Sequence, residues 1–265
     1  MKDAENREII LEAKSLRKDF GGLVAVDDVS VQVRARTLHS IIGPNGAGKT
    51  TLFNLLSGTM PPTQGQVFFK GRDITHAPPY RMARLGLGRS FQITNIFSNL
   101  TVLENVRLAA QAVGGDNFKL WRHVVGLRRY QEKALEIIGQ VGLSGREAML
   151  ASVLPHGDKR KLELGIMLAS DPELLLLDEP TAGMSSEQVP ALLEIIQGIL
   201  ASDDKTIVLV EHRMDVVMNI SNFITVMHQG RVLAEGSPRE IAANEAVQSA
   251  YLGALYGDLS IQQEV

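Results

Sequence analysis

The chain has no cysteine among its 265 residues. Disulfide bonds and thiolate metal sites are therefore excluded, and the sequence is compatible with a reducing compartment. Basic residues are not in excess either, because 27 Lys and Arg stand against 30 Asp and Glu, for a net charge of −3. A protein that neutralises many phosphates needs a basic surplus, so nucleic acid is not expected as a partner.

Long apolar runs are also missing. No run approaches the roughly 18 residues that a membrane-spanning helix requires. The N-terminal residues 1–7 are charged and contain no apolar signal core. We therefore expect any role at a membrane to come through a partner. The length of 265 residues is enough for one large α/β domain or two modest ones, and the hydrophobic content of 45% supports a sizeable core.

The most informative motif is Gly-Pro-Asn-Gly-Ala-Gly-Lys-Thr-Thr at residues 43–51, which matches the phosphate-binding pattern G-x-x-x-x-G-K-[ST]. An apolar run that predicts a strand precedes it, and residues 52–56 after it predict a helix. Glycines let backbone N–H groups surround phosphate oxygens, and a helix N-terminus adds partial positive charge. We expect Lys49 to reach the β- and γ-phosphates and Thr50 to hold Mg²⁺ through its hydroxyl. The other predicted contacts are Gly43, Pro44, Asn45, Gly46, Ala47, Gly48 and Thr51.

A second motif is a run of four leucines at residues 174–177 that ends in Asp178 and Glu179. A continuous apolar run predicts a strand buried on both faces of a parallel sheet. Near a phosphate-binding loop, Asp178 can hold Mg²⁺ through water, and Glu179 can polarise a water that attacks the γ-phosphate. The alternative is a strand that ends in a solvated acidic turn, and the presence of the phosphate-binding motif disfavours it.

Two single residues are weaker candidates. His212 follows the predicted strand 206–210 and could contact the γ-phosphate, although a lone histidine is usually structural. Gln92 lies where the core should pass into a helical region, and its amide could contact both Mg²⁺ and the attacking water. A surface glutamine is the ordinary alternative for that position.

Hydrophobic periodicity predicts the remaining elements. Two alternating stretches near the N-terminus predict an antiparallel sheet that leads into the strand before the phosphate loop, and the middle third predicts a mostly helical insertion. The expected strands are 11–16, 24–33, 38–42, 66–69, 73–74, 173–178, 206–210, 223–227 and 231–235, and the expected helices begin at 52 and cover 100–113, 130–141, 159–169 and 188–200.

The set of motifs resembles the ATPase subunits of ABC transporters, over nearly the whole chain. The phosphate loop, Gln92, a signature region at 154–158, the acidic strand end and His212 follow one another in the order of that family. The resemblance implies an α/β fold with a RecA-like P-loop NTPase core, an antiparallel β subdomain and an inserted α-helical subdomain. It implies one domain over 1–265, with its core at 1–91 and 160–235, a helical insertion at 92–159 and a C-terminal extension at 236–265.

The resemblance also implies ATP and Mg²⁺ as ligands and gives roles to individual residues. Phe20 matches the aromatic that stacks on adenine, with a core phenylalanine as the alternative. Lys49, Gln92, Glu179 and His212 are implied as catalytic. The residues implied to hold the metal are Thr50, Gln92 and Asp178.

The signature region departs from the family pattern. The family reads Leu-Ser-Gly-Gly-Gln, where the serine bonds the γ-phosphate held by a second subunit, and this chain reads Leu-Pro-His-Gly-Asp. Pro155 has neither a hydroxyl nor an N–H group. His156, Gly157 and Asp158 remain as the expected contacts to nucleotide, and a degenerate half-site is the alternative.

Within the family, the chain resembles the ATPases of branched-chain amino acid importers, through residues 19–25, 88–92, 179–184 and 250–253. Urea-importer ATPases share Ala-Gly-Met at 182–184, so an ATPase of a urea or amide importer, a lipid-exporter ATPase and a soluble ABC ATPase stay as alternatives. The resemblance implies transmembrane permease subunits, a second ATPase subunit of the same or a homologous chain, and a solute-binding protein outside the membrane. It also implies a cytoplasmic chain that is peripheral on the inner face of the cell membrane through the permease subunits.

Overall fold

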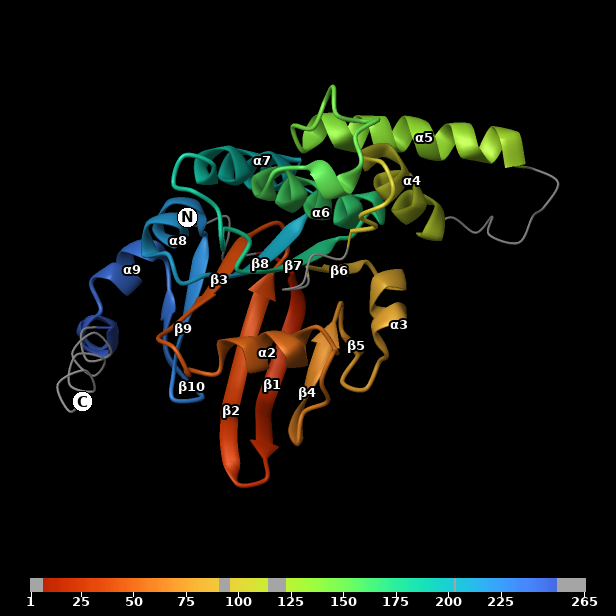
Figure 1. Cartoon of the computed structure of the whole chain (residues 1–265). Helices are drawn as coiled ribbons and strands as arrows, with labels where there is room; N and C mark the ends of the chain where they lie inside the picture. The colour runs from red at the N-terminus through yellow and green to blue at the C-terminus, as the bar shows by residue number, and fades with distance from the viewer. Residues whose placement is uncertain (1–6, 91–95, 114–122, 203, 252–265) are drawn as a thin grey trace. The chain divides into compact units, whose positions relative to one another are not determined.

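A computed structural model describes residues 7–90, 96–113, 123–202 and 204–251 of the chain (Figure 1). Internal contacts divide the chain into two compact units, residues 1–82 with 203–265, and residues 83–202. Within the described residues, no helix is both long and apolar enough to cross a membrane.

The first unit contains an antiparallel sheet with the strand order β2-β1-β4-β5. Its strands are β1 (Ile9–Phe20), β2 (Leu23–Arg34), β4 (Gln64–Phe69) and β5 (Arg72–Asp73). In β2, Val29, Val31 and Val33 are buried while the residues between them are exposed. This alternation is what a sheet with one covered face requires, and it is the signal from which the sheet was predicted.

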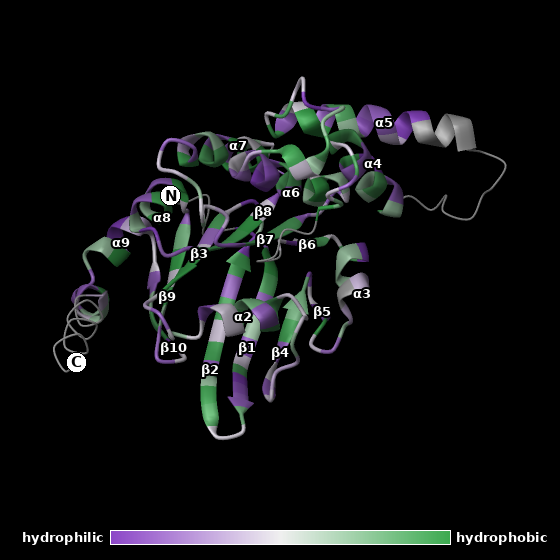
Figure 2. Cartoon of the chain, in the orientation of Figure 1, coloured by the Kyte–Doolittle hydropathy of each residue, from purple (hydrophilic) through white to green (hydrophobic). Residues whose placement is uncertain are grey.

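A second group of strands in this unit carries the phosphate loop. β3 (Leu38–Ile42) pairs in parallel with β8 (Thr206–Val210) and with β9 (Phe223–His228), and β9 pairs antiparallel with β10 (Arg231–Gly236). Every residue of β3 and β8 is buried, which explains their continuous apolar sequences, and Figure 2 shows hydrophobic colour along β8. The predicted bounds of β3 and β8 are confirmed to the residue.

The helices of the first unit are short. They are α2 (Lys49–Leu56), α8 (Met214–Ile220) and α9 (Pro238–Ala242), and residues 245–251 are also helical. A capping box between Ser237 and Glu240 begins α9. Helices α8 and α9 could not be predicted from the sequence, because each is too short to show a helical period. The same holds for α3 (Pro79–Arg84), which spans the division between the units.

The second unit is mostly helical. Its strand β6 (Leu87–Arg89) pairs in parallel with β7 (Leu174–Asp178). Helices α4 (Val102–Val113), α5 (His123–Gln140) and α6 (His156–Ala169) pack against one another, as Figure 1 shows, and α7 (Val189–Ala201) follows β7 in the chain. A short 3₁₀ turn, η1 (Ala151–Val153), precedes α6. Helix α6 begins three residues earlier than predicted, so His156 and Gly157 belong to its first turn.

Candidate functional site

The loop between β3 and α2 has a backbone path that requires glycine at two positions. Gly43 has φ of 153° and Gly48 has φ of 94°. A Cβ atom on Gly43 would lie 2.2 Å from the carbonyl oxygen of Met227, and one on Gly48 would lie 2.3 Å from that of Ala25. Both glycines are therefore fixed by close backbone approaches as well as by conformation.

Lys49 is the first residue of α2 and is nearly buried. Its Nζ donates hydrogen bonds to the carbonyl oxygens of Gly43 at 2.8 Å and Pro44 at 3.0 Å. The ammonium group thus lies against the glycine-rich loop, and its predicted contact with the β- and γ-phosphates stays a prediction. Thr50, the predicted metal ligand, is exposed beside it. The first N–H groups of a helix have no partner within the helix, and a phosphate can accept them.

The loop is also held by the turn between β9 and β10. The N–H of Gly230 donates to the carbonyl oxygen of Ala47 at 3.1 Å, and the carbonyl oxygen of Gly230 accepts from Asp27 N–H at 2.8 Å. The Asp27 carboxylate pairs with Arg231 at 2.5 Å and also with Arg17. The hydrogen bond from Arg231 is the largest cause of the lowered pKa of Asp27.

His212 follows β8 and is exposed, with 55% of its side chain accessible. The preceding Glu211 is fully buried. Its Oε2 accepts the His212 N–H at 3.2 Å and lies 4.0 Å from His212 Nδ1. Glu211 therefore orients the segment that carries His212, a role that the sequence analysis missed because adjacency alone gives no signal for it.

Phe20 is the last residue of β1 and is 47% exposed. The Nζ of Lys18 lies 5.3 Å from the centre of its ring. This exposure is incompatible with a core phenylalanine, the alternative for this position. Stacking on adenine stays a prediction.

The second unit carries the acidic strand end. All five residues of β7 are buried, including Asp178, which is 3% exposed. Glu179 follows with a positive φ of 45°. This left-handed conformation is costly for a residue other than glycine, and strain of this kind is often found at functional sites.

Ser90 joins the ends of β6 and β7. Its N–H donates to the carbonyl oxygen of Leu176 at 2.8 Å, and its hydroxyl oxygen accepts the N–H of Asp178 at 2.9 Å. Arg89 is close enough to Asp178 for the two charges to interact. Burial lowers the pKa of Arg89, and the negative charge of Asp178 partly offsets that effect. Neither interaction could be predicted from the sequence. Gln92, two residues beyond Ser90, lies outside the described residues.

The signature region forms the start of α6. His156 is exposed, and its ring lies against the loop after β7, because a Cβ atom on Gly183 would lie 3.1 Å from His156 Cε1. Gly157 is buried beneath the side-chain amide of Gln188, where a Cβ atom would lie 3.1 Å from Oε1. Gln188 is a neighbour of the signature that sequence reasoning did not single out.

Asp158 occupies a different environment from the two residues before it. It is 9% exposed and forms ion pairs with Arg146 and, at 3.8 Å, with Lys161. Its carboxylate is thus engaged within the unit, while His156 faces solvent. Of the three predicted signature contacts, His156 is the most accessible side chain.

Comparisons with known proteins agree with these motifs. A family model described as ABC transporter matches residues 26–182, and one described as branched-chain amino acid ATP-binding cassette transporter matches residues 231–255. The high-affinity branched-chain amino acid transport ATP-binding protein LivG of Salmonella typhimurium is 40% identical over 249 residues, which are 92% of this chain and 98% of that protein. BraF of Pseudomonas aeruginosa, with the same description, is 37% identical over 254 residues, at the same coverage.

A solved structure is similar as well. It is the ADP conformation of an ATP-binding cassette of an ABC transporter, with a TM-score of 0.80 and 29% sequence identity. The match covers 93% of this chain and 99% of the solved one. The expected α/β P-loop NTPase fold is confirmed, whereas the domain boundaries and the roles of single residues stay predictions.

Proposed function

The chain belongs to the ATP-binding subunits of ABC transporters and is an ATPase, and we propose from this membership that it powers the import of branched-chain amino acids. The observation that carries the choice of solute is the match of residues 231–255 to the branched-chain amino acid family model. The similarity to LivG over almost its full length supports the same choice. The alternatives are an ATPase of a urea or amide importer and an ATPase of a lipid exporter.

In the proposed reaction, the phosphate loop binds the β- and γ-phosphates of ATP. The backbone path that Gly43 and Gly48 allow supports this role, as does the position of Lys49 Nζ over the loop. Lys49 would exchange its bonds to backbone carbonyl oxygens for bonds to phosphate oxygens. Phe20, exposed at the end of β1, would stack on the adenine.

Mg²⁺ fits the donors that the motifs supply. Thr50 offers a hydroxyl oxygen and Asp178 a carboxylate, and such hard oxygen ligands are the ones that Mg²⁺ prefers. Thr50, Asp178 and Gln92 would hold the ion, whose contribution is to neutralise charge on the phosphates. Ser90 and Arg89 support the Asp178 end of this set through a hydrogen bond and a charge interaction.

Hydrolysis is proposed as in-line attack of water on the γ-phosphate. Glu179 takes the proton of the attacking water as general base, and Lys49 stabilises the charge that develops on the phosphate oxygens. His212 and Gln92 contact the γ-phosphate and the attacking water. The buried Glu211 supports this role for His212, because it fixes the backbone from which the imidazole extends.

Assembly follows the family pattern in this proposal. Two ATPase subunits, identical or homologous, face each other head to tail, and the signature of one contacts the ATP of the other. The exposed His156 and the N–H of Gly157 are the groups that remain for this contact, since Pro155 has no hydroxyl. Permease subunits would hold the pair at the inner face of the membrane, and an external binding protein would deliver the solute.

Uptake by cells tests the proposed solute. Cells whose only copy of this chain carries Glu179→Gln should lose uptake of labelled leucine and keep uptake of an unrelated sugar. Cells with the wild-type chain, measured in parallel, serve as the control. Normal leucine uptake combined with lost urea uptake would replace the proposal by its first alternative, and normal uptake of both solutes would count against an import role.

A further inference from the structure

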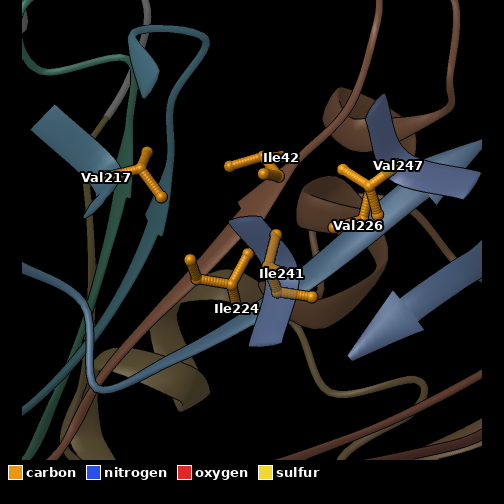
Figure 3. Packing of buried hydrophobic residues seen from close by; sticks show 6 residues of the cluster. All are labelled: Ile42, Val217, Ile224, Val226, Ile241 and Val247. Atoms are coloured by element: carbon orange, nitrogen blue, oxygen red, sulfur yellow. The ribbon is translucent and has the colours of Figure 1, made fainter. Parts of the chain in front are cut away.

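The C-terminal segment, defined here as residues 237–251, packs against the strand that leads into the phosphate loop. Ile241 and Val247 from this segment join Ile42 and Val226 in a buried cluster that also contains Val217 and Ile224 (Figure 3). Every member of this cluster is 3% exposed or less. Ile42 is the residue directly before Gly43, so the cluster fixes the point at which β3 becomes the loop.

Tyr251 extends this packing toward the loop itself. Its ring packs against the same cluster, and its hydroxyl oxygen is buried. Burial raises the pKa of Tyr251 to about 12, an effect that the nearby backbone N–H of Gly43 partly offsets. The tyrosine therefore packs against the cluster that contains Ile42, the residue directly before the phosphate loop.

Loop residues 44–47 are less closely packed against the C-terminal segment than Ile42 is. A groove of about 660 Å³ separates loop residues 44–47 from the C-terminal segment, which contributes Ala246, Ser249 and Ala250 to the lining. His228 and Gln229 close one side of the groove. Because side chains do not fill this space, the packing at Ile42 and Tyr251 is what the C-terminal segment contributes to the geometry of the loop.

We propose that Tyr251 is a positioning residue for nucleotide binding, which braces the junction between Ile42 and Gly43 in the conformation that accepts phosphate. A loop that is already ordered loses less conformational entropy when it binds a ligand. Without the ring, the free loop samples more conformations, and nucleotide must select the competent one. Loss of the ring should therefore lower the affinity for nucleotide and leave the chemical step unchanged, since Tyr251 touches no reacting group.

The test measures the binding of ADP and ATP to the purified full-length chain, by titration calorimetry, in Tyr251→Ala, Tyr251→Phe and Met218→Ala. Met218 packs against the same cluster from α8 and is the matched control for loss of packing. Tyr251→Ala should weaken binding about 5- to 10-fold and raise KM equally, with kcat within about twofold of wild type. Tyr251→Phe keeps the ring and should restore affinity to within about twofold.

The possible results distinguish a specific positioning role of Tyr251 from a general loss of packing in the buried cluster. A loss in Met218→Ala equal to that in Tyr251→Ala would overturn the proposal, because weakened packing of the whole cluster would then explain both. A loss in Tyr251→Phe as large as in Tyr251→Ala would also overturn it, because Tyr251→Phe keeps the ring that is proposed to hold the junction in place. Unchanged affinity in Tyr251→Ala, with a native melting temperature, would also overturn it.

This inference rests on the proposed role of the phosphate loop, and Lys49→Ala distinguishes the two. If Lys49→Ala binds ADP and ATP as tightly as wild type, the assignment of the loop as the phosphate site fails. If Lys49→Ala weakens binding while Tyr251→Ala does not, the loop assignment holds and only the positioning role of Tyr251 fails.

Discussion

The imidazole of His39 and the hydroxyl of Thr225 lie 2.8 Å apart and connect β3 to β9 inside the first unit. The Thr225 hydroxyl in turn donates to Oε1 of Glu235 at 2.6 Å. A hydroxyl has a single proton, so while Glu235 is ionised Thr225 must accept from His39, and the proton of the neutral ring is then on Nε2. The ring of Phe223 meets the imidazole edge-on, with ring centres 5.2 Å apart.

This arrangement predicts that acid destabilises the protein through His39. Burial lowers the pKa of His39 from 6.5 to about 4. Between these values the unfolded chain binds a proton that the folded chain does not, so stability rises with pH from about 4 to 6.5 and is then fully present. Integrated over this window, the free energy of unfolding should fall by about 3 kcal/mol from pH 7 to pH 4.

Urea unfolding at a series of pH values measures this dependence. Desolvation raises the pKa of Glu235 above its ordinary value of 4.5. Just above pH 4.5 the folded chain therefore binds a proton at Glu235 that the unfolded chain does not, so acid stabilises the fold through Glu235, opposite to its effect through His39. The comparison is therefore made in a Glu235→Gln background, with and without His39→Gln. Glutamine keeps a polar side chain beside Thr225 but does not titrate, so the slope should be lost. An equal slope in both variants would assign the acid sensitivity to other groups.

The strands that are buried along their whole length could be predicted from the sequence. β3 and β8 were predicted to the residue because a strand buried on both faces must be apolar throughout, and the motif then fixes the end of β3. The start of α6 was misplaced by three residues. Proline is well tolerated just before a helix, where its missing N–H has no role, and α6 begins directly after Pro155.

In the candidate site, only the residues that belong to a sequence motif could be predicted from the sequence. The motif places Lys49 in contact with the loop, because its nine residues are consecutive, and contact of Lys49 with phosphate stays a prediction. The supporting residues were not predictable, since Glu211, Gln188 and Tyr251 act through contacts that depend on tertiary structure. Ser90 lies within residues 88–92, which carry part of the family resemblance, but its hydrogen bond to Asp178, 88 residues away, depends on the tertiary fold.

Gly48→Ala should prevent the phosphate loop from forming. The new Cβ atom would lie 2.3 Å from a backbone oxygen of Ala25, which cannot move without displacing β2, and φ of 94° is strained for alanine. We expect the free energy of unfolding to fall by about 3 kcal/mol or more, with loss of nucleotide binding. The control is Gly21→Ala, where φ is 64° but no atom lies within 4 Å of the new Cβ. That variant should lose only about 1 kcal/mol, and an equal loss in both would mean that the close approach to Ala25 is unimportant.

Glu179→Gln should abolish turnover while leaving ATP binding intact. The amide keeps the shape of the side chain but cannot accept a proton from water, so the chemical step loses its base and the binding step does not. The hydrolysis rate should fall below about a tenth of the wild-type rate. Glu173→Gln, an exposed change just before β7, is the control and should keep wild-type turnover. Retention of more than about a tenth of the rate in Glu179→Gln would remove Glu179 as the base.

Pro155→Ser should strengthen association of two subunits around ATP. Position 155 is the N-cap of α6, where serine is among the best residues, and its hydroxyl would restore the family's phosphate donor. The measurement is size-exclusion chromatography with and without ATP–Mg²⁺ in a Glu179→Gln background, which preserves bound ATP. The double variant should form more dimer than Glu179→Gln alone, while Pro155→Ala, which gains an N–H but no hydroxyl, should gain less. If Glu179→Gln alone already dimerises fully with ATP, His156 and Gly157 suffice for the contact between subunits. If no variant dimerises although each binds ATP, the working pair requires a different ATPase subunit or the permease.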